Sequence, residues 1–434
     1  MELLIRLTTT VIFVWIVVVW GMRFMHETGI DYQKNRFGKW CSKKERWEGE
    51  VFQPKSACIV FGMALFVRIL FYILGIVLCI RTGNYDGGFG WDEFLDSWKR
   101  WDALHYINLA DMGYKGYEEN GQHLFLVFFP LYPWMLRMLH VIIHRWEVAA
   151  LFLSTFAFCV GSVFFYGVIQ EEFGKKMAGR AWLLLVCYPF SFFFGGMMTE
   201  SLFFCLMSAG FFYIRRHRWL IAGMIGAFCA MCRIQGILLL GVGLVEFCVT
   251  YRPIEMLREK RGVMFVKAFF TKGIFLFLTL IGNGVYFWLN KSVEGDWMRF
   301  RVYQKEHWYH TTTWVSKCLD EIIGYLSPDT EYEMLIYVWI PELVLFVVTM
   351  CLLLYAVRRY PLRYSAFLLV YVILNYSVTF LISGGRYMAC ALPAFLFLAG
   401  MAGRKKLLYP VLLIVSVSCM VFYFYGYMSG QQVL

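Results

Sequence analysis

The segment from residue 97 to residue 114 combines a carboxylate and an imidazole, two groups that exchange protons in catalysis. It reads SWKRWDALHYINLADMGY, a pattern that predicts a short amphipathic helix beginning near Trp101. Asp102 and His105 are three residues apart, so a helix places both on one face. The alternative is that Asp102 only caps the helix and that His105 is an interfacial side chain. The pattern alone leaves both interpretations open.

Three further ionisable residues interrupt apolar stretches and are candidates for a buried site. Glu200 follows YPFSFFFGGMMT, Arg233 has apolar residues on both sides, and Arg386 follows SGG. Charges at such positions are costly and usually line a cavity. The alternative for Arg233 is an ion pair with Glu200 that joins two helices, and both roles can hold together. Arginines that face a lipid-bounded cavity suit a phosphate group, because the guanidinium matches phosphate oxygens.

A third cluster of polar residues lies between residues 304 and 310. It contains Gln304, Glu306, His307 and Trp308, and His310 follows. The histidines show neither HExxH nor a cysteine partner at ligand spacing, so we expect no metal site here. We expect no cofactor, although the acidic residues of the loop before residue 123 leave a divalent metal open.

The elements that must position these residues are membrane-spanning helices. The chain has 434 residues, of which 60% are hydrophobic and 16% charged, and its mean hydropathy is +0.59. Soluble domains carry about 25% charged residues, and a helix needs about 20 apolar residues to cross a bilayer. We expect an all-α polytopic membrane protein with about 12 spans, near residues 3–20, 57–80, 147–169, 181–198, 199–215, 218–232, 235–250, 271–289, 333–357, 361–382, 386–402 and 406–427. The net charge of +11 then reflects basic cytoplasmic loops rather than a nucleic-acid partner.

The charge distribution also predicts the orientation and the domains. The basic segment from Arg23 to Lys55 is placed in the cytoplasm, so the acidic stretch 81–123 is on the other side. We expect an added helix and basic loop over residues 1–55, and one membrane domain over 56–434 with outer loops 81–146 and 290–332. The stretch 124–143 contains FFPLYP and is too interrupted for a comfortable span. We expect it to be re-entrant or interfacial and to roof a cavity. Trp98, Trp101 and Tyr106 are expected at the level of the lipid headgroups.

Five motifs resemble the PIG-V-type mannosyltransferases, the family of the second mannosyltransferase of GPI-anchor assembly and its bacterial relatives. In order, they are RWDALHYINLADMGY with FFPLYPWMLR, then YPFSFFFGGMMTESLF, CRIQGILL, VYQKEHW and GGRYMACALPAF. The resemblance spans about residues 57 to 400. Met198 departs from it, because the family usually has a tyrosine before the threonine.

The resemblance implies the GT-C fold with a large first outer loop and an inverting transferase. Such an enzyme moves a hexose, typically mannose, from a polyprenyl-phosphate carrier to an acceptor on the outer or lumenal face. The acceptor is a glycolipid, a glycan or a protein. The catalytic base matches Asp102, and the supporting or substrate-binding residues are Trp101, His105, Glu200, Arg233, Gln304, Trp308, Arg386 and Tyr387. The expected location is a bacterial plasma membrane, or the endoplasmic reticulum membrane in a eukaryote.

The chemistry agrees with this implication. Displacement with inversion needs one base on the acceptor hydroxyl, and a phosphate leaving group needs positive charge rather than an acid. Two other classes stay open. A transporter or flippase of lipid-linked sugars would place polar residues deep in many spans and show paired halves. A scaffold subunit of a membrane complex fits each motif separately but not their joint occurrence.

Overall fold

The computed structural model describes residues 2–32, 35–43, 45–83 and 89–433. In these residues the fold is helical, and the only β pairing consists of two isolated bridges, Glu119–Gln122 and Thr312–Val378. The predicted all-α class is confirmed.

Seven helical segments are long and apolar enough to cross a membrane, so the chain is an integral membrane protein. They are α1 (Glu2–Glu27), α3 (Pro54–Thr82), α7 (Trp146–Phe173), η3 with α11 (Ile234–Tyr251), η4 with α14 (Gly273–Glu294), α17 to α18 (Tyr332–Ala356) and α22 (Leu408–Met428). Shorter apolar helices are α10 (Trp219–Cys232), α13 (Gly262–Thr271), α19 (Leu362–Tyr376) and α21 (Leu392–Ala402). A count of 12 full-length spans is therefore not confirmed.

Two stretches predicted as continuous spans are broken in the structure. In 181–198 the helix α8 (Lys175–Val186) ends early, and a 3₁₀ turn, η2 (Ser191–Gly195), follows. Pro189 explains the break, because proline lacks a donor and keeps the preceding residue out of the helical region. In 386–402 the short helix α20 (Gly384–Met388) stops before α21, which has proline near its start. The predicted span 361–382 also ends early, at Tyr376. Broken backbone of this kind, at membrane depth, belongs beside a cavity or within protein.

Two long connections between the helices cover nearly the same residues as the predicted outer loops. The first, between α3 and α7, contains α4 (Trp91–Ser97), α5 (Ala103–Met112), η1 (Leu124–Val127) and α6 (Leu131–His140). The second, between α14 and α17, contains α15 (Arg299–His307) and α16 (Val315–Gly324). The stretch 124–143 forms only η1 and α6, and ten helical residues rise about 15 Å, too little to cross a bilayer.

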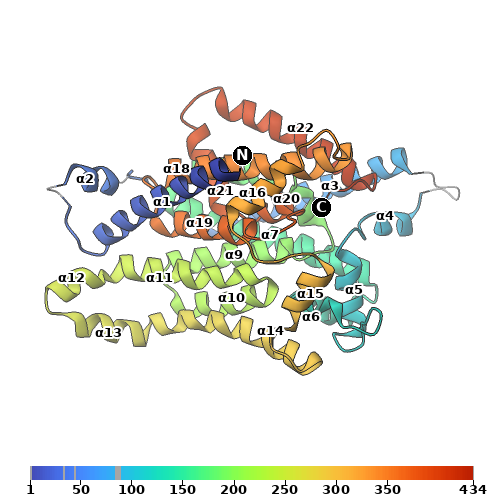
Figure 1. Ribbon diagram of the computed structural model, residues 1–434, viewed down its shortest axis with the longest axis horizontal. Coiled ribbons are helices and arrows are strands. Elements are labelled where there is room, and N and C mark those ends of the chain that lie inside the picture. The colour runs from blue at the N-terminus through green and yellow to red at the C-terminus, as the bar shows by residue number, and fades with distance from the viewer. Residues whose placement is uncertain (1, 33–34, 44, 84–88, 434) are drawn as a thin grey trace.

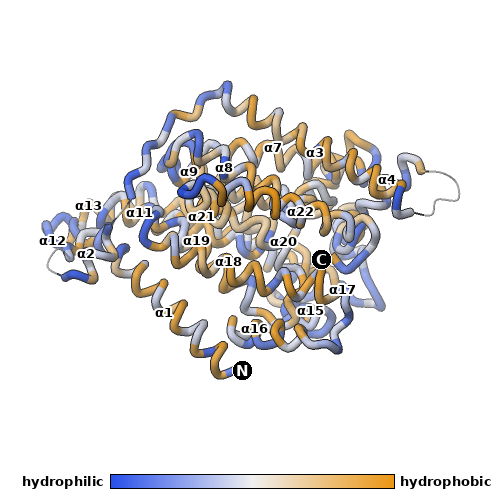
Figure 2. Tube along the Cα trace, turned by 90° about the horizontal axis from the view of Figure 1, so that it is seen from above, coloured by the Kyte–Doolittle hydropathy of each residue, from blue (hydrophilic) through white to orange (hydrophobic). Residues whose placement is uncertain are grey.

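The long helices run along the long axis of the molecule (Figure 1). In this view α4, α5, α6 and α15 lie at the right-hand end, and α12 (Pro253–Arg258) and α2 (Arg36–Ser42) lie at the left-hand end. Figure 2 shows hydrophobic residues along the long helices and hydrophilic stretches in the connecting segments. The N-terminal helix α1 is not detached, because Arg23 donates through Nη1 to the carbonyl oxygen of Tyr360 at 2.9 Å.

A buried arginine joins three helices at the end opposite α5 and α15. Arg363, near the start of α19, donates to Glu246 of α11 at 2.6 Å and also to Glu172 at the end of α7. The Tyr364 hydroxyl adds a bond to Glu172 at 2.8 Å, and the His217 imidazole lies 3.4 Å from Glu246. We call Arg363, Glu172 and Glu246 the closing network.

Candidate active site

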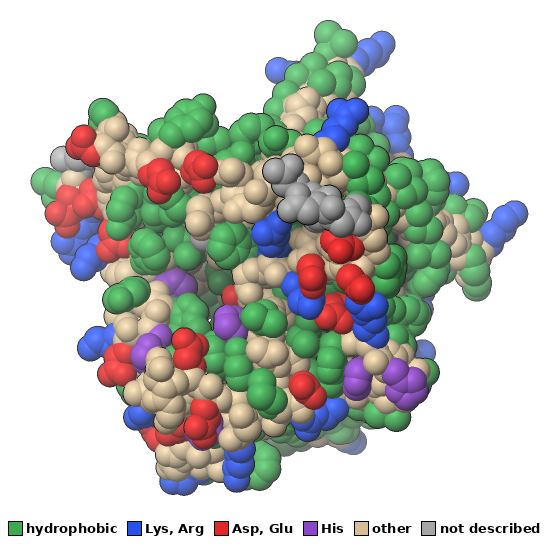
Figure 3. Space-filling view, turned by 90° about the vertical axis from the view of Figure 1, so that its right-hand side faces the viewer, with side chains coloured by type: hydrophobic (Ala, Val, Ile, Leu, Met, Phe, Trp, Pro, Cys, Tyr) green, Lys and Arg blue, Asp and Glu red, His purple; other side chains and the backbone are tan. Residues whose placement is uncertain are grey.

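A cavity of about 510 Å³ lies between the first long connection, the second long connection and the broken backbone. Eight of the nine predicted site residues line it: Trp101, Asp102, His105, Arg233, Gln304, Trp308, Arg386 and Tyr387. Val127, Phe128 and Phe129 also line it, where the FFPLYP stretch was expected to form a roof. Figure 3 shows the end of the molecule to which α5 and α15 belong, where acidic, basic and histidine side chains are mixed with hydrophobic ones.

Asp102 occupies the capping position of α5 but does not cap the helix. Its side chain makes no capping hydrogen bond, and Oδ2 instead accepts from Nη2 of Arg386 at 2.6 Å. The helix begins at Ala103, because Trp101 has a left-handed backbone with φ of +50°. The Asp102 side chain is 29% exposed and lines the cavity. The capping interpretation is therefore wrong, and the carboxylate is available to a bound molecule.

Glu200 is the ninth predicted residue and lies behind the cavity wall. It is fully buried, and its Oε1 accepts from Nε of Arg386 and from Nη2 of Arg233. Arg233 also donates through Nε to the Thr199 hydroxyl at 2.7 Å. The predicted ion pair between Arg233 and Glu200 is present, and Arg233 lines the cavity as well. Arg233 therefore both pairs with Glu200 and lines the cavity.

The four charged residues form one balanced set, which we call the cavity network: Asp102, Arg386, Glu200 and Arg233. Two carboxylates and two guanidinium groups alternate, so each buried charge has an opposite neighbour. Arg386 uses Nε and Nη2 inside this network, whereas Arg233 uses Nη2 inside it and Nε for the Thr199 hydroxyl. In the described part of the chain, neither Nη1 has a hydrogen bond, and both residues border the cavity. Two guanidinium groups thus keep donors for an anion, at positions that the carboxylates fix.

His105 lies one turn after Asp102 and faces the same cavity. Its ring stacks on Phe125 with centroids 4.3 Å apart, and Nδ1 lies 2.9 Å from the Tyr117 hydroxyl. Burial lowers the pKa of His105, while the nearby carboxylates of Asp102 and Glu119 act in the opposite direction. The ring is therefore predominantly neutral at pH 7, where it can both donate and accept hydrogen bonds.

Gln304 and Trp308 reach the cavity because the second long connection is tied to the backbone beyond α19. The Thr313 N–H donates to the Ser377 carbonyl at 2.9 Å, and the His310 ring lies 3.1 Å from the Phe380 carbonyl. This tie helps to bring Gln304 and Trp308 to the same cavity as Arg386, although about 80 residues separate them in the chain.

Some residues at the cavity were missed or misplaced from the sequence. Tyr106 and Trp98 were expected at headgroup level, but both are buried, and Tyr106 lines the cavity. Gln235 lines it too, with its amide held by Asn375 at 3.1 Å. Ser383 and His310 complete the polar lining. Gln235 could have been predicted as a lining residue, because it stands two residues after Arg233 in CRIQGILL. Ser383 could not, because nothing marks it in the sequence except its place before the GGRY motif.

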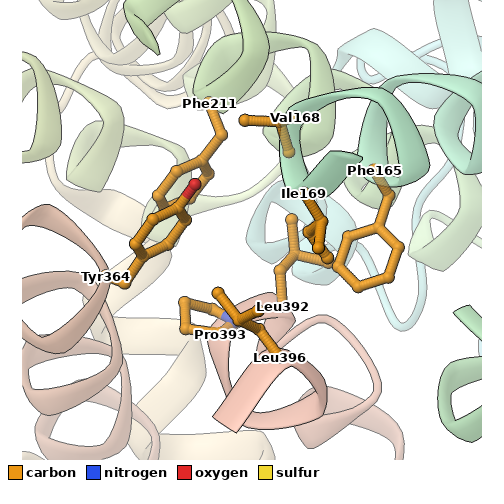
Figure 4. A pocket seen from close by; sticks show the side chains of 8 residues that line it. All are labelled: Phe165, Val168, Ile169, Phe211, Tyr364, Leu392, Pro393 and Leu396. Atoms are coloured by element: carbon orange, nitrogen blue, oxygen red, sulfur yellow. The ribbon is translucent and has the colours of Figure 1, made fainter. Parts of the chain in front are cut away.

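A second, very small pocket has a volume of about 10 Å³ and is apolar (Figure 4). Its lining is Phe165, Val168, Ile169, Phe211, Tyr364, Leu392, Pro393 and Leu396. It offers neither space nor charge for a substrate. Across the described residues, no three histidine, cysteine, aspartate or glutamate side chains gather to hold a metal ion.

Residues 89–304 match the model of the family described as mannosyltransferase (PIG-V). This confirms the resemblance that the motifs carry, and the motifs from Arg100 to Leu239 lie within the matched segment. Arg386 and Tyr387 lie outside it, and only the fold brings them to the same cavity.

Two solved structures are similar to the chain. ArnT from Cupriavidus metallidurans, bound to undecaprenyl phosphate, has 13% identity and a TM-score of 0.48, with 86% of this chain and 77% of that chain covered. The Archaeoglobus fulgidus oligosaccharyltransferase in the apo form has 12% identity and a TM-score of 0.44, with 85% of this chain covered. The chain spans 56% of that oligosaccharyltransferase. No curated protein sequence matches the chain.

Proposed function

Because residues 89–304 belong to the mannosyltransferase (PIG-V) family, we propose that the chain is an inverting GT-C glycosyltransferase that uses a polyprenyl-phosphate-linked hexose. The proposed sugar is mannose, and the acceptor is an extracytoplasmic glycolipid, glycan or protein. The observation that carries the proposal is the cavity network, which places one accessible carboxylate at the same cavity as two arginines whose Nη1 groups have no hydrogen bond among the described residues.

The reaction follows from these groups. An acceptor hydroxyl attacks the anomeric carbon, and Asp102 takes the hydroxyl proton as the new glycosidic bond forms. The bond between the anomeric carbon and the carrier phosphate breaks on the opposite face of the sugar. The released phosphate monoester gains negative charge, which the Nη1 groups of Arg233 and Arg386 stabilise. Attack on one face and departure from the other invert the configuration.

The remaining lining suits a sugar. Trp101 and Trp308 offer aromatic faces, and Gln304, Gln235 and the neutral His105 offer hydrogen bonds to hydroxyl groups. Of the described residues that line the cavity, only Asp102 carries a carboxyl group, but a phosphate leaving group does not need an acid.

A flippase of lipid-linked sugars is the alternative from another class. It would need a polar path that continues toward the opposite end of the molecule. The closing network lies there, and its arginine is bonded to two carboxylates that join α7, α11 and α19. This arrangement favours a one-sided enzyme over a transport path.

The test uses purified protein in vesicles that contain polyprenyl-phosphate mannose and an extract of candidate acceptors. We expect a new glycosidic product by mass spectrometry, and none with Asp102→Asn. Movement of the lipid-linked sugar across the vesicle membrane without any product would overturn the proposal in favour of the flippase. Mass spectrometry of surface glycans from cells with and without the protein then identifies the acceptor.

A further inference from the structure

Glu342 is a buried carboxylate that the cavity network does not include. It lies near the start of α18 (Ile340–Ala356) and is 1% exposed. Among the described residues no cationic side chain pairs with it. A carboxylate without a cation inside an apolar segment is costly, so its position calls for a functional reason.

The partners of Glu342 belong to the backbone that leads into Arg386. Oε1 accepts from the Gly384 N–H, and a second backbone hydrogen bond comes from Gly385. The Tyr376 hydroxyl lies 3.4 Å from Oε2. Two successive amides at the start of α20 therefore have the Glu342 carboxylate as their acceptor.

The fit between the carboxylate and this turn is tight. A Cβ atom added at Gly384 would lie 1.8 Å from Oε2 of Glu342. The first glycine of the GGRY motif is thus needed because the carboxylate packs directly against its Cα. The Tyr188 and Tyr371 hydroxyls hold the carbonyls of Gly385 and Tyr387 at 2.9 and 2.8 Å, so neighbouring helices fix the same turn.

The helix before Glu342 is irregular. Leu335–Trp339 is a π-helical segment, and Ile340 and Pro341 follow it. π-Helical insertions are rare and occur frequently at functional sites. Here the irregular segment ends three residues before Glu342, the residue that reaches Gly384.

From these contacts we infer that Glu342 is a positioning residue for the cavity network: it holds the Gly384–Gly385 backbone and thereby places the Arg386 guanidinium between Glu200 and Asp102. The expected loss of turnover rests on the proposed function, whereas the expected loosening of the Gly384–Gly385 backbone does not. Misplacement of a reacting or supporting group by about 1 Å lowers turnover by about 10²-fold.

The experiment compares the wild type with Glu342→Leu, Glu342→Gln and a control, Thr349→Val. Thr349 is buried in the same helix and bonds only to the carbonyl of its own Leu345 at 2.7 Å. Hydrogen–deuterium exchange of a peptide covering residues 381–391 reports on the turn without requiring activity. Turnover with polyprenyl-phosphate mannose reports on the reaction.

We expect faster exchange of the Gly384 and Gly385 amides in Glu342→Leu, and a loss of kcat of about tenfold to a hundredfold with a smaller change in donor KM. Glu342→Gln keeps an acceptor oxygen, so its amide exchange and its kcat should stay close to those of the wild type. Thr349→Val should match the wild type in both measurements. If Glu342→Leu cannot be purified, Gly384→Ala replaces it, because its Cβ displaces the same carboxylate.

Unchanged exchange in Glu342→Leu overturns the inference, whether or not the wild type is active. Faster exchange with wild-type kcat in an active enzyme also overturns it, because the turn would then not control Arg386. An inactive wild type contradicts the proposed function instead, and the exchange data still decide whether Glu342 holds the turn.

Discussion

Two networks of arginine and carboxylate lie at opposite ends of the molecule and differ in what their side chains face. In the closing network Arg363 directs both terminal nitrogens to Glu246 and Glu172, its buried Nε has no partner among the described residues, and none of the three residues lines the cavity. In the cavity network, each arginine borders the cavity with one terminal nitrogen that has no partner among the described residues. The same residue types can therefore join helices with or without bordering a cavity, and the difference lies in whether the donors without a partner face open space.

The largest effect is expected from Asp102→Asn, which keeps the shape of the side chain but removes the base. Turnover should fall by about 10²- to 10⁴-fold, as for loss of a general base. The unfolding temperature in detergent should fall only slightly, because asparagine can still accept from Arg386 and Arg386 keeps Glu200 as its charged partner. Asp111→Asn, an exposed change on the same helix, is the matched control and should keep full activity. Normal turnover of Asp102→Asn would assign the base elsewhere.

The closing network should respond in stability rather than in chemistry. Arg363→Met leaves the Glu172 and Glu246 carboxylates without their cation, which costs about 3–5 kcal/mol for a broken buried pair. We expect a lower unfolding temperature by light scattering or fluorescence, with kcat unchanged in the fraction that stays folded. Adding Glu172→Gln and Glu246→Gln should recover part of the loss. If Arg363→Met kept its unfolding temperature but lost kcat, the closing network would act on turnover rather than on stability, and the proposed difference between the two networks would be contradicted.

A conservative change at Arg233 separates charge from geometry within the cavity network. Arg233→Lys keeps the positive charge, but the ammonium donates from a single nitrogen and does not match the separate positions from which the guanidinium nitrogens reach Thr199, Glu200 and the cavity. Loss of one charge-assisted hydrogen bond, about 1.5–3 kcal/mol, should reduce kcat/KM by tenfold or more. Arg216→Lys, in an exposed pair with Glu171, is the control and should have no effect. An unchanged kcat/KM in both Arg233→Lys and Arg216→Lys would show that Arg233 contributes only its positive charge to the structure.

The smallest expected effect concerns the pH dependence of stability. Burial lowers the pKa of His105 in the folded protein, so the unfolded chain binds a proton more readily. Its contribution to stability is present above about pH 6.5, the ordinary histidine pKa, and is lost as the pH falls through the lower folded pKa. Unfolding temperatures measured from pH 8 to pH 5 should fall less steeply for His105→Gln than for the wild type. Parallel curves would show that His105 is not desolvated at the cavity.

The sequence predicted the membrane architecture and the residues of the site better than it predicted the continuity of the helices. Apolar stretches identify spans by length, but 181–198 and 386–402 appeared continuous because broken backbone beside a cavity is as apolar as a helix. Arg233 and Arg386 could be recognised because charges in apolar surroundings are rare, and Asp102 because His105 follows it at helical spacing. Glu342 is also a charge in an apolar stretch, but its role could not be predicted, since it depends on contact with Gly384, which is more than 40 positions away.

The most direct test of the central claim is the configuration of the product. Purified protein is supplied with polyprenyl-phosphate mannose labelled with ¹³C at the anomeric carbon, together with the acceptor identified from the glycan comparison. Nuclear magnetic resonance of the product then gives the anomeric configuration. We expect a single product with the configuration opposite to that of the donor, since in the proposed reaction the acceptor oxygen attacks the face of the sugar opposite the departing phosphate. A product that retains the donor configuration would contradict it.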